Sequence, residues 1–439
     1  MSLRPHSLVD QLRTAVRGPV HAPGDPGFAV VHRPWNLAVA QDVPAVVEAR
    51  DAEDVRAVLT LAARHRVPVA AQPTGHGASG RAAGAILLRT GRLDEITIDP
   101  HRRVARIGAG VLSGALQRAA AVHGLTGLPG SSPVVSVAGV VLGGGLSWFG
   151  RALGWAADSL LAAEVVTADG ALRRVDPDSD PELLWALRGG GGDLAVLTAL
   201  ELRLHPAPAV VGGRMLWPAE HAREVAAAFE EITAAAPDQL TTWFSLLTPP
   251  GGAPLVALDA AYLGQEAEAR ELLAPADLLP APLSDTRAPM STAEMGTITG
   301  EPTDPTPGAS RAELLGGVDA AALEALLAAP IAPLLTAQIR HLGGAFAHPS
   351  DSPHGPLLEP FVLYAFGLAP TPEAQEAVVR RQAELVAPLP LTGRAPLVFL
   401  DPSKRIEDAL PPRSVARLRA LKEHWDPADR VRGNVAISG

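Results

Sequence analysis

The stretch VPVAAQPTGHGASG, residues 67–80, decides how the rest of this chain is interpreted. An apolar run, typical of a buried strand, leads into a turn in which Gly75, Gly77 and Gly80 have the spacing G-x-G-x-x-G. The residue between the first two glycines is His76. Three interpretations are open: a dinucleotide-binding turn, a turn whose backbone holds an anion, or a plain glycine-rich turn with an ordinary histidine.

The residues after the glycines argue against a dinucleotide-binding turn. Such a turn needs a helix whose N-terminus faces the pyrophosphate and an acidic residue about 20 positions later. Residues 81–90, RAAGAILLRT, instead predict a second strand, and Asp94 lies in a turn-like segment. Successive backbone N–H groups in a tight turn can bind a phosphate without a helix. The anion-binding turn and the plain turn therefore stay open.

The flanking sequence predicts mixed α/β structure up to about residue 208. Residues 44–71 contain an apolar run, a helix capped by Asp51 with Asp54 three residues later, and a second apolar run, which together predict a β-α-β unit. Residues 160–176 predict a hairpin that turns at Asp169-Gly170. Further strands are expected within 84–90, 95–100 and 103–110, and helices within 111–124 and 179–190.

The glycine-rich character ends at LRLHPAPAV, residues 202–210. Longer strand and helix patterns follow up to residue 400 and predict an antiparallel sheet with helices on one face. The segment from Ala274 to Ser310 is crowded with Pro, Ser, Thr and Asp and predicts an irregular loop or lid. The tail predicts a helix that ends at Asp426-Pro427 and then an extended end.

Composition narrows the class of protein. The 439 residues, 47% apolar and 19% charged, can bury a large core in two or more domains. The net charge of −10, without a dense Lys/Arg cluster, argues against a nucleic-acid partner. The absence of cysteine excludes disulfides, thiolate metal sites and iron–sulfur clusters, and the 13 histidines lack metal-ligand spacing. Without an apolar run of roughly 18 residues, we expect a cytoplasmic protein, and the 42 Gly and 42 Pro suggest a high-GC bacterial gene.

A second glycine-rich stretch, residues 127–170, contains GLPGSSPVVSVAGVVLGGGLSWFG. Together with PTGHGASG, it resembles the FAD-linked oxidases of the vanillyl-alcohol oxidase superfamily, in their berberine-bridge-enzyme-like branch. The resemblance covers about residues 40–208 and the C-terminal tail. It implies an α+β fold: a PCMH-type FAD-binding domain of two α/β subdomains, formed by residues 1–208 and 401–439, and between them, in 209–400, a substrate domain with an antiparallel sheet covered by helices.

The resemblance also implies a cofactor and its attachment. In that family the GHG loop wraps the FAD pyrophosphate with backbone amides, and its histidine is bonded to the 8α-methyl carbon of the flavin, which gives His76 that role here. Relatives with a second flavin link carry a cysteine where this chain has Ser132, so we expect a link through His76 only. The implied cofactor-binding residues are Pro73, Thr74, Gly75, His76, Gly77, Ala78, Ser79, Ser131, Ser132, Val135, Gly139, Gly143, Gly144, Gly145, Val166 and Asn434.

Some positions depart from the family pattern. Asp193 stands where the family has asparagine, Ala195 where it has glycine, and Ala436 where it has a second asparagine, which leaves the contacts at those places open. Val135 lies where a small residue permits access of oxygen, which favours an oxidase, although valine is also an ordinary core residue.

The catalytic positions depart most. Alcohol-oxidising relatives carry tyrosines before the last helix, where this chain has Leu410, Pro411 and Val415, so the usual base is missing. Something must accept the proton when hydride leaves an unactivated alcohol. The catalytic candidates are Tyr364 and His348, with His354 also in the substrate half. The simpler interpretation of Tyr364 is a strand residue that packs on a helix, the two histidines could lie on an exposed loop, and an already acidic substrate would need little help.

These observations predict an FAD-dependent oxidase. We expect it to transfer a hydride from a small, fairly apolar secondary metabolite to flavin N5, with O₂ as electron acceptor and with no nucleic-acid or membrane partner. Two alternatives remain: a flavoprotein cyclase or isomerase with no net oxidation, and a non-catalytic binding protein that retains the fold.

Overall fold

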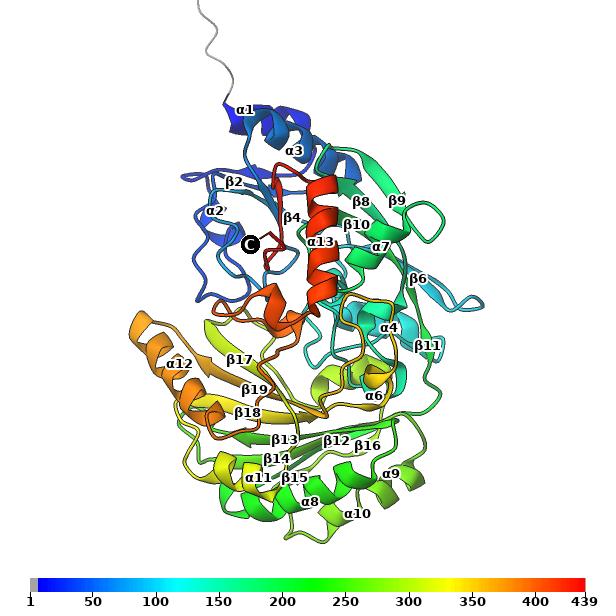
Figure 1. Cartoon of the computed structure of the whole chain (residues 1–439), viewed down its shortest axis with the longest axis vertical. Helices are drawn as coiled ribbons and strands as arrows, with labels where there is room; N and C mark the ends of the chain where they lie inside the picture. The colour runs from blue at the N-terminus through cyan, green and yellow to red at the C-terminus, as the bar shows by residue number, and fades with distance from the viewer. Residues whose placement is uncertain (1–6, 439) are drawn as a thin grey trace, which may run out of the picture.

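The structure is a computed structural model that describes residues 7–438. It has an upper part, made of two small sheets with helices around them, and a lower part, made of one wide sheet above a layer of helices (Figure 1). Residues 1–6 and Gly439, which belong to the expected domains, lie outside the described residues.

The first sheet of the upper part contains the strand that precedes the histidine turn. Its strands lie in the order β1 (Val20–His21), β2 (Ala45–Glu48), β4 (Ile86–Arg89), β3 (Val69–Ala71) and β20 (Val431–Arg432). Helix α3 (Ala52–His65) joins β2 to β3, and α1 (Leu8–Ala15) packs on it. The predicted β-α-β unit is confirmed, with the Asp51 carboxylate accepting hydrogen bonds from the N–H groups of Glu53 and Asp54. Strand β20 pairs in parallel with β3, which brings the C-terminal tail beside the histidine turn.

The second sheet of the upper part is antiparallel. Its strands lie in the order β5 (Ile96–Asp99), β6 (Val104–Gly108), β10 (Ala195–Arg203), β8 (Leu160–Thr167) and β9 (Leu172–Val175). The hairpin between β8 and β9 is confirmed, and Gly170 turns it with a φ of +80°. The remaining elements of this half are α2 (Phe28–Val31), α4 (Ser113–Ala121), β7 (Leu125–Thr126), α5 (Val137–Leu142), α6 (Gly150–Leu153), α7 (Pro181–Leu187) and β11 (His205–Pro206).

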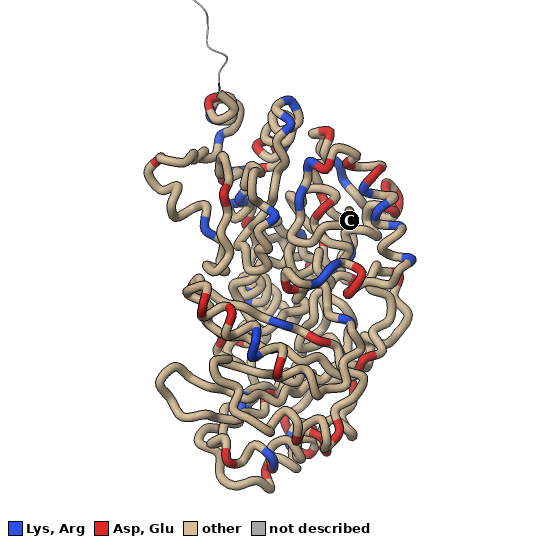
Figure 2. The backbone as a smooth tube through the Cα atoms, turned by 60° about the vertical axis from the view of Figure 1, so that its left-hand side comes forward, with Lys and Arg blue, Asp and Glu red and all other residues tan. Residues whose placement is uncertain are grey.

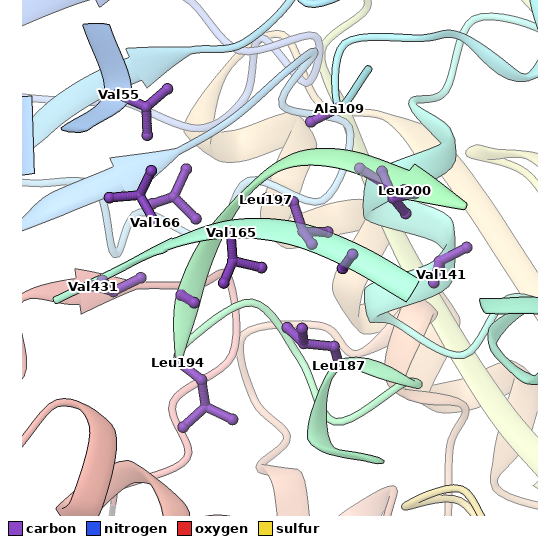
Figure 3. Close-up of a cluster of buried hydrophobic side chains, with 14 of the residues drawn as sticks. Val55, Ala109, Val141, Val165, Val166, Leu187, Leu194, Leu197, Leu200 and Val431 are labelled. Carbon is purple, nitrogen blue, oxygen red and sulfur yellow. The ribbon is translucent and has the colours of Figure 1, made fainter. Parts of the chain in front are cut away.

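One hydrophobic core joins the two upper sheets. Figure 3 shows Val55 of α3 beside Val166 of β8, with Leu197 of β10 and Val431 of β20 in the same cluster. Helix α13 (Pro412–Trp425) returns to this part of the molecule, as the red helix of Figure 1 shows, and contributes Leu418 to the core. The N-terminal and C-terminal segments therefore share one core.

The lower part is the antiparallel sheet that the sequence predicts. Its strands are β15 (Ser284–Asp285), β12 (Val211–Pro218), β14 (Leu255–Tyr262), β13 (Leu240–Leu247), β18 (Leu334–His341), β19 (Phe361–Leu368) and β17 (Gly308–Leu315) in that order, with β16 (Ala288–Pro289) also paired to β12. The layer below it consists of α8 (Ala222–Ala235), α9 (Glu266–Leu272), α10 (Ala274–Asp277), α11 (Ala320–Leu327) and α12 (Pro372–Val386) (Figure 1). The opposite face of the sheet meets the upper part, where Trp148 stacks on Trp243 with ring centroids 3.8 Å apart.

The expectation of an irregular segment between Ala274 and Ser310 holds only in part. Strands β15 and β16 lie within it and pair with β12 to form the edge of the sheet, and a short 3₁₀ helix, Thr292–Thr297, contacts α4 of the upper part. An edge position tolerates the proline in β16 because one side of an edge strand needs no hydrogen-bond donor.

Charged residues of both signs are mixed along the outer turns of the chain in Figure 2. Many form exposed ion pairs, such as Arg223 with Glu324. Among the helices of the described residues, none is both long and apolar enough to cross a membrane.

Candidate cofactor and substrate site

The histidine turn follows β3 directly, and its backbone requires glycine. Gly75 has a φ of +81° and Gly80 a φ of +83°, which L side chains rarely adopt. A Cβ atom on Gly75 would lie 2.8 Å from the Cβ of Pro34, and one on Gly77 would lie 3.0 Å from the amide nitrogen of Asn434. The turn is therefore closely packed between residue 34 and the C-terminal tail.

Most backbone amides of this turn have no protein partner. The Ala78 N–H donates to the carbonyl of Gly75 at 3.2 Å. The N–H groups that donate to no acceptor among residues 7–438 are those of Gly75, His76, Gly77, Ser79 and Gly80. Gly77 is exposed and Ser79 and Gly80 are half-buried, so these amides are accessible, and successive accessible amides in a tight turn can hold an anion. A turn of this kind fits a diphosphate, which agrees with the anion-binding interpretation of the sequence.

The His76 imidazole is held on one side and free on the other. Its ring stacks on Trp35 with centroids 4.1 Å apart, and its Nδ1 lies 2.9 Å from Thr74 Oγ1. Its Nε2 is buried and has no hydrogen-bond partner within the described part of the chain. Burial lowers the pKa of His76 to about 4, so the ring is neutral at pH 7. A neutral imidazole with an unpartnered nitrogen is able to bond to a group that the turn encloses.

The second glycine-rich stretch supplies further backbone without side chains. Gly144 has a φ of +92° and Gly145 one of +78°, and a Cβ on Gly143 would lie 3.1 Å from Val398. Ser132 Oγ is buried without a hydrogen-bond partner among the residues that the structure describes. Free amides, an unpartnered imidazole nitrogen and an unpartnered hydroxyl at the expected positions fit an FAD cofactor.

Two predicted cofactor residues, Val166 and Val135, make backbone contacts within the upper part of the molecule. Val166 lies in β8, where it pairs with Val196 and packs in the core of Figure 3. Val135 is half-buried, and its carbonyl accepts a hydrogen bond from the Ser113 N–H at 2.9 Å. Asn434 lies in the C-terminal tail, which the Asp193 carboxylate holds in place.

Asp193, whose contacts the sequence left open, fixes the C-terminal tail against the histidine turn. Its fully buried carboxylate accepts hydrogen bonds from Arg81 Nη1 at 2.8 Å, from the Gly433 N–H at 2.7 Å and from the Ile437 N–H at 3.2 Å. Lys422 Nζ lies 3.8 Å from the same carboxylate. The carboxylate therefore has two cations near it, and it holds Asn434 between two anchored residues, Gly433 and Ile437.

The His354 side chain packs against the second glycine-rich stretch and is not exposed. Its side chain is buried and stacks on Trp155 with centroids 4.3 Å apart. A Cβ on Gly144 would lie 2.2 Å from its Nε2, which has no hydrogen-bond partner among the described residues. Burial lowers the pKa of His354 to about 3. The alternative of an exposed loop is therefore wrong for this histidine.

The two catalytic candidates have different surroundings. The Tyr364 ring, on β19, faces the Arg340 guanidinium, whose central carbon lies 4.7 Å from the centroid of the ring. The centroids of the Tyr364 and Phe399 rings are 5.2 Å apart. Burial raises the pKa of Tyr364 above its ordinary value near 10. His348 is exposed. No contact joins Tyr364 to His348 within the described residues. Leu410 and Val415, at the positions of the missing tyrosines, are core residues.

Comparison with known proteins identifies the cofactor-binding part. Residues 43–176 match the protein family described as "FAD binding domain". The solved structure of 6-hydroxy-D-nicotine oxidase from Arthrobacter nicotinovorans has the same fold, with a TM-score of 0.86 and 24% identity over 96% of this chain and 98% of that chain. Glucooligosaccharide oxidase from Acremonium strictum has a TM-score of 0.82 and 18% identity over 99% of each chain, and is described as carrying a 6-S-cysteinyl, 8α-N1-histidyl FAD. The fold is thus the PCMH-type FAD-binding fold.

Curated sequences narrow the relationship further. The (R)-6-hydroxynicotine oxidase of Paenarthrobacter nicotinovorans is 32% identical over 206 residues, which cover 46% of this chain and 45% of that protein. An uncharacterized FAD-linked oxidoreductase of Bacillus subtilis is 27% identical over 267 residues, 60% of this chain and 59% of that protein. The matches span roughly half the length of these relatives. The chain therefore carries an FAD-binding domain homologous to those of FAD-linked oxidoreductases and oxidases.

Proposed function

We propose that this chain is an FAD-dependent oxidase whose cofactor is attached through His76 alone. The observation that carries the proposal is the turn of free amides around a buried imidazole whose Nε2 has no partner in the described chain. Ser132 stands where a second attachment would need a cysteine. The relatives named above as oxidases support the same class of activity.

The cofactor-binding residues have separate tasks in this proposal. The amides of residues 75–80 bind the diphosphate, and Gly143 to Gly145 let it approach the backbone. Trp35 stacks on His76 and holds the imidazole at the angle for attachment. Asn434, held by the anchored tail, donates to the flavin ring. FAD held by these residues would supply the hydride-acceptor chemistry, with O₂ as the proposed final electron acceptor.

Proton removal falls to Tyr364 or to the substrate itself. The raised pKa keeps the Tyr364 phenol protonated at pH 7, so it could accept a proton only after passing its own to a neighbouring acceptor. Arg340 beside the ring favours the phenolate and reduces that cost. We favour Tyr364 over His348 as the base. His348 is exposed, so water competes with the substrate for it. An acidic substrate would need neither residue.

We assign the lower sheet to substrate binding and the setting to specialised bacterial metabolism in the cytoplasm. The proposed domains are residues 1–208 with 401–439 for FAD and 209–400 for the substrate. The apolar residues on the inner face of the lower sheet suit a small, fairly apolar substrate.

The oxidase proposal is tested without knowledge of the substrate. Purified holoprotein is reduced by light in the absence of air and then mixed with air-saturated buffer. An oxidase regains its oxidised flavin band rapidly and forms one hydrogen peroxide per flavin. Return of the band no faster than for free reduced FAD would contradict an oxidase and leave a dehydrogenase or a cyclase.

A further inference from the structure

Arg340 on β18 is buried without the partners that a buried arginine ordinarily has. The described residues include two buried arginines, Arg151 and Arg340, 4% and 5% exposed. Arg151 donates to four backbone carbonyls, those of Leu240, Leu342, Ala236 and Pro237. Arg340 has a single acceptor, the side-chain oxygen of Gln338, which receives its Nε at 3.0 Å and its Nη2 at 2.6 Å.

No carboxylate of the described chain forms an ion pair with Arg340. Asp259, on the same sheet, already accepts hydrogen bonds from Arg214 and Ser245. The charge of Glu301 acts on Arg340, but Glu301 makes neither an ion pair nor a hydrogen bond with it in the described chain. A buried cation paired only with a neutral amide is costly, because its desolvation is not offset by an opposite charge.

Aromatic rings surround the guanidinium and compensate part of that cost. Its central carbon lies 3.9 Å from the ring centroid of Trp243, 4.7 Å from that of Tyr364 and 5.4 Å from that of Phe399. Cation–π contacts of this kind stabilise a buried charge. Gln338 orients the Nε and Nη2 edge, and Nη1 donates to no acceptor among residues 7–438.

This group lies beside the expected cofactor site. Trp148, from the second glycine-rich stretch, stacks on Trp243 with centroids 3.8 Å apart. Val398, which precedes Phe399, lies against Gly143, since a Cβ there would be 3.1 Å from it. The guanidinium therefore stands on the sheet face that meets the upper part of the molecule, and aromatic side chains form its walls.

We propose that Arg340, oriented by Gln338, binds the carboxylate of a substrate whose body is a planar or aromatic ring. This inference rests on the proposed function and names its substrate class. A carboxylate supplies the missing counter-charge and accepts hydrogen bonds from guanidinium N–H groups. The partly buried Phe399 offers a face for a planar ring, whereas Trp243 is covered by Trp148 on one face and by Arg340 on the other. Arg340 is then a specificity-determining residue, and the negative charge of Glu301 opposes the bound anion.

The test compares probes that differ only in charge or in the ring. Purified holoprotein is titrated with benzoate, with neutral benzamide and with acetate, and binding is followed calorimetrically and by the flavin absorbance. We expect benzoate to bind at least tenfold more tightly than either of the others. Arg340→Met should abolish the preference over benzamide, and Glu301→Gln should tighten benzoate binding severalfold. Arg223→Met, which breaks an exposed ion pair on α8, should change neither.

Three results would overturn the inference: equal binding of benzoate and benzamide, unchanged benzoate binding in the folded Arg340→Met variant, and no benzoate binding at all. Benzoate binding no tighter than acetate would overturn the aromatic part, because it would indicate a site for any small anion. If Arg340→Met does not fold, the Glu301→Gln result decides, and no change in it would contradict the proposal. Calorimetry also measures benzoate binding in protein that contains no flavin. Failure of the proposed function can therefore be distinguished from failure of this inference.

Discussion

Trp35 and His76 stack with ring centroids 4.1 Å apart and ring planes inclined by 15°. The Trp35 N–H also donates to the Thr74 carbonyl at 2.9 Å, so the tryptophan binds the histidine turn through both its backbone and its ring. The stack covers one face of the imidazole and leaves its edge at Nε2 without a protein partner in the described structure. The turn is therefore built to present His76 in one orientation.

Replacing His76 by alanine should leave protein without covalently attached flavin. The turn amides remain, so FAD should still bind reversibly, but acid precipitation should release all the yellow colour into the supernatant. His123→Ala, at an exposed histidine far along the chain, is the control and should retain the colour in the pellet. Colour that stays in the pellet of the His76→Ala protein would show that another residue carries the link.

Gly75→Ala should destabilise the protein more than Gly80→Ala. Both positions have a positive φ, which costs about 1 kcal/mol for alanine. At Gly75 the added Cβ would also lie 2.8 Å from Pro34, which adds about 1–3 kcal/mol of overpacking, whereas nothing lies within 4 Å at Gly80. Urea unfolding of the two variants measures the difference. Equal losses would mean that the turn does not pack on Pro34 as described.

Asp193→Ala should cost about 3–5 kcal/mol of unfolding free energy. The substitution leaves Arg81 without its buried counter-charge and two tail amides without their acceptor, whereas Lys422 keeps its buried ion pair with Asp426. FAD affinity should fall as well, because the tail carries Asn434. Glu182→Ala removes an exposed ion pair with Arg417 and should change stability by less than about 1 kcal/mol. A loss at Asp193 as small as that at Glu182 would contradict this description of the tail.

Acid should weaken the fold through its buried histidines. The pKa of His354 falls to about 3, against an ordinary value of 6.5, and His341, His205 and His76 are lowered in the same direction. Between pH 6.5 and about 3 the unfolded chain binds protons that the folded chain does not, so stability falls as the pH falls, by up to about 1.4 kcal/mol per pH unit for each histidine.

The variant His354→Phe keeps a ring on Trp155 and removes one of these titrations. Its unfolding free energy, measured in urea at pH 7, 6 and 5, should depend less steeply on pH than that of the unchanged chain. An identical slope would mean that His354 is not kept neutral by burial in the folded state.

Local signals in the sequence were sufficient for most of the fold. Asp51 caps α3 and Gly170 turns the β8–β9 hairpin, because caps and turns depend on residues within a few positions. The edge strands β15 and β16 were missed because their Pro-rich and Ser-rich sequence is typical of a loop, and only pairing with β12 makes them strands.

The site was predictable only where glycine and histidine mark it. Trp35, Arg340 and the partners of Asp193 carry no local signal, because their contacts join distant parts of the chain. Arg81 and Asp193 are 112 positions apart, and Gly433 is 240 from Asp193. The available hint is Asp193 itself, at a position where the resemblance implies asparagine, since a buried carboxylate requires a cation nearby. Arg81, directly after Gly80, is the cation that pairs with Asp193.

The most direct test of the account is the intact mass of the purified, denatured protein. A covalent link through His76 predicts a mass equal to the chain plus one FAD less two hydrogen atoms, with no flavin released on denaturation. A mass equal to the bare chain, in protein that stays colourless after incubation with excess FAD or gives up all its flavin to the denaturant, would contradict the central claim.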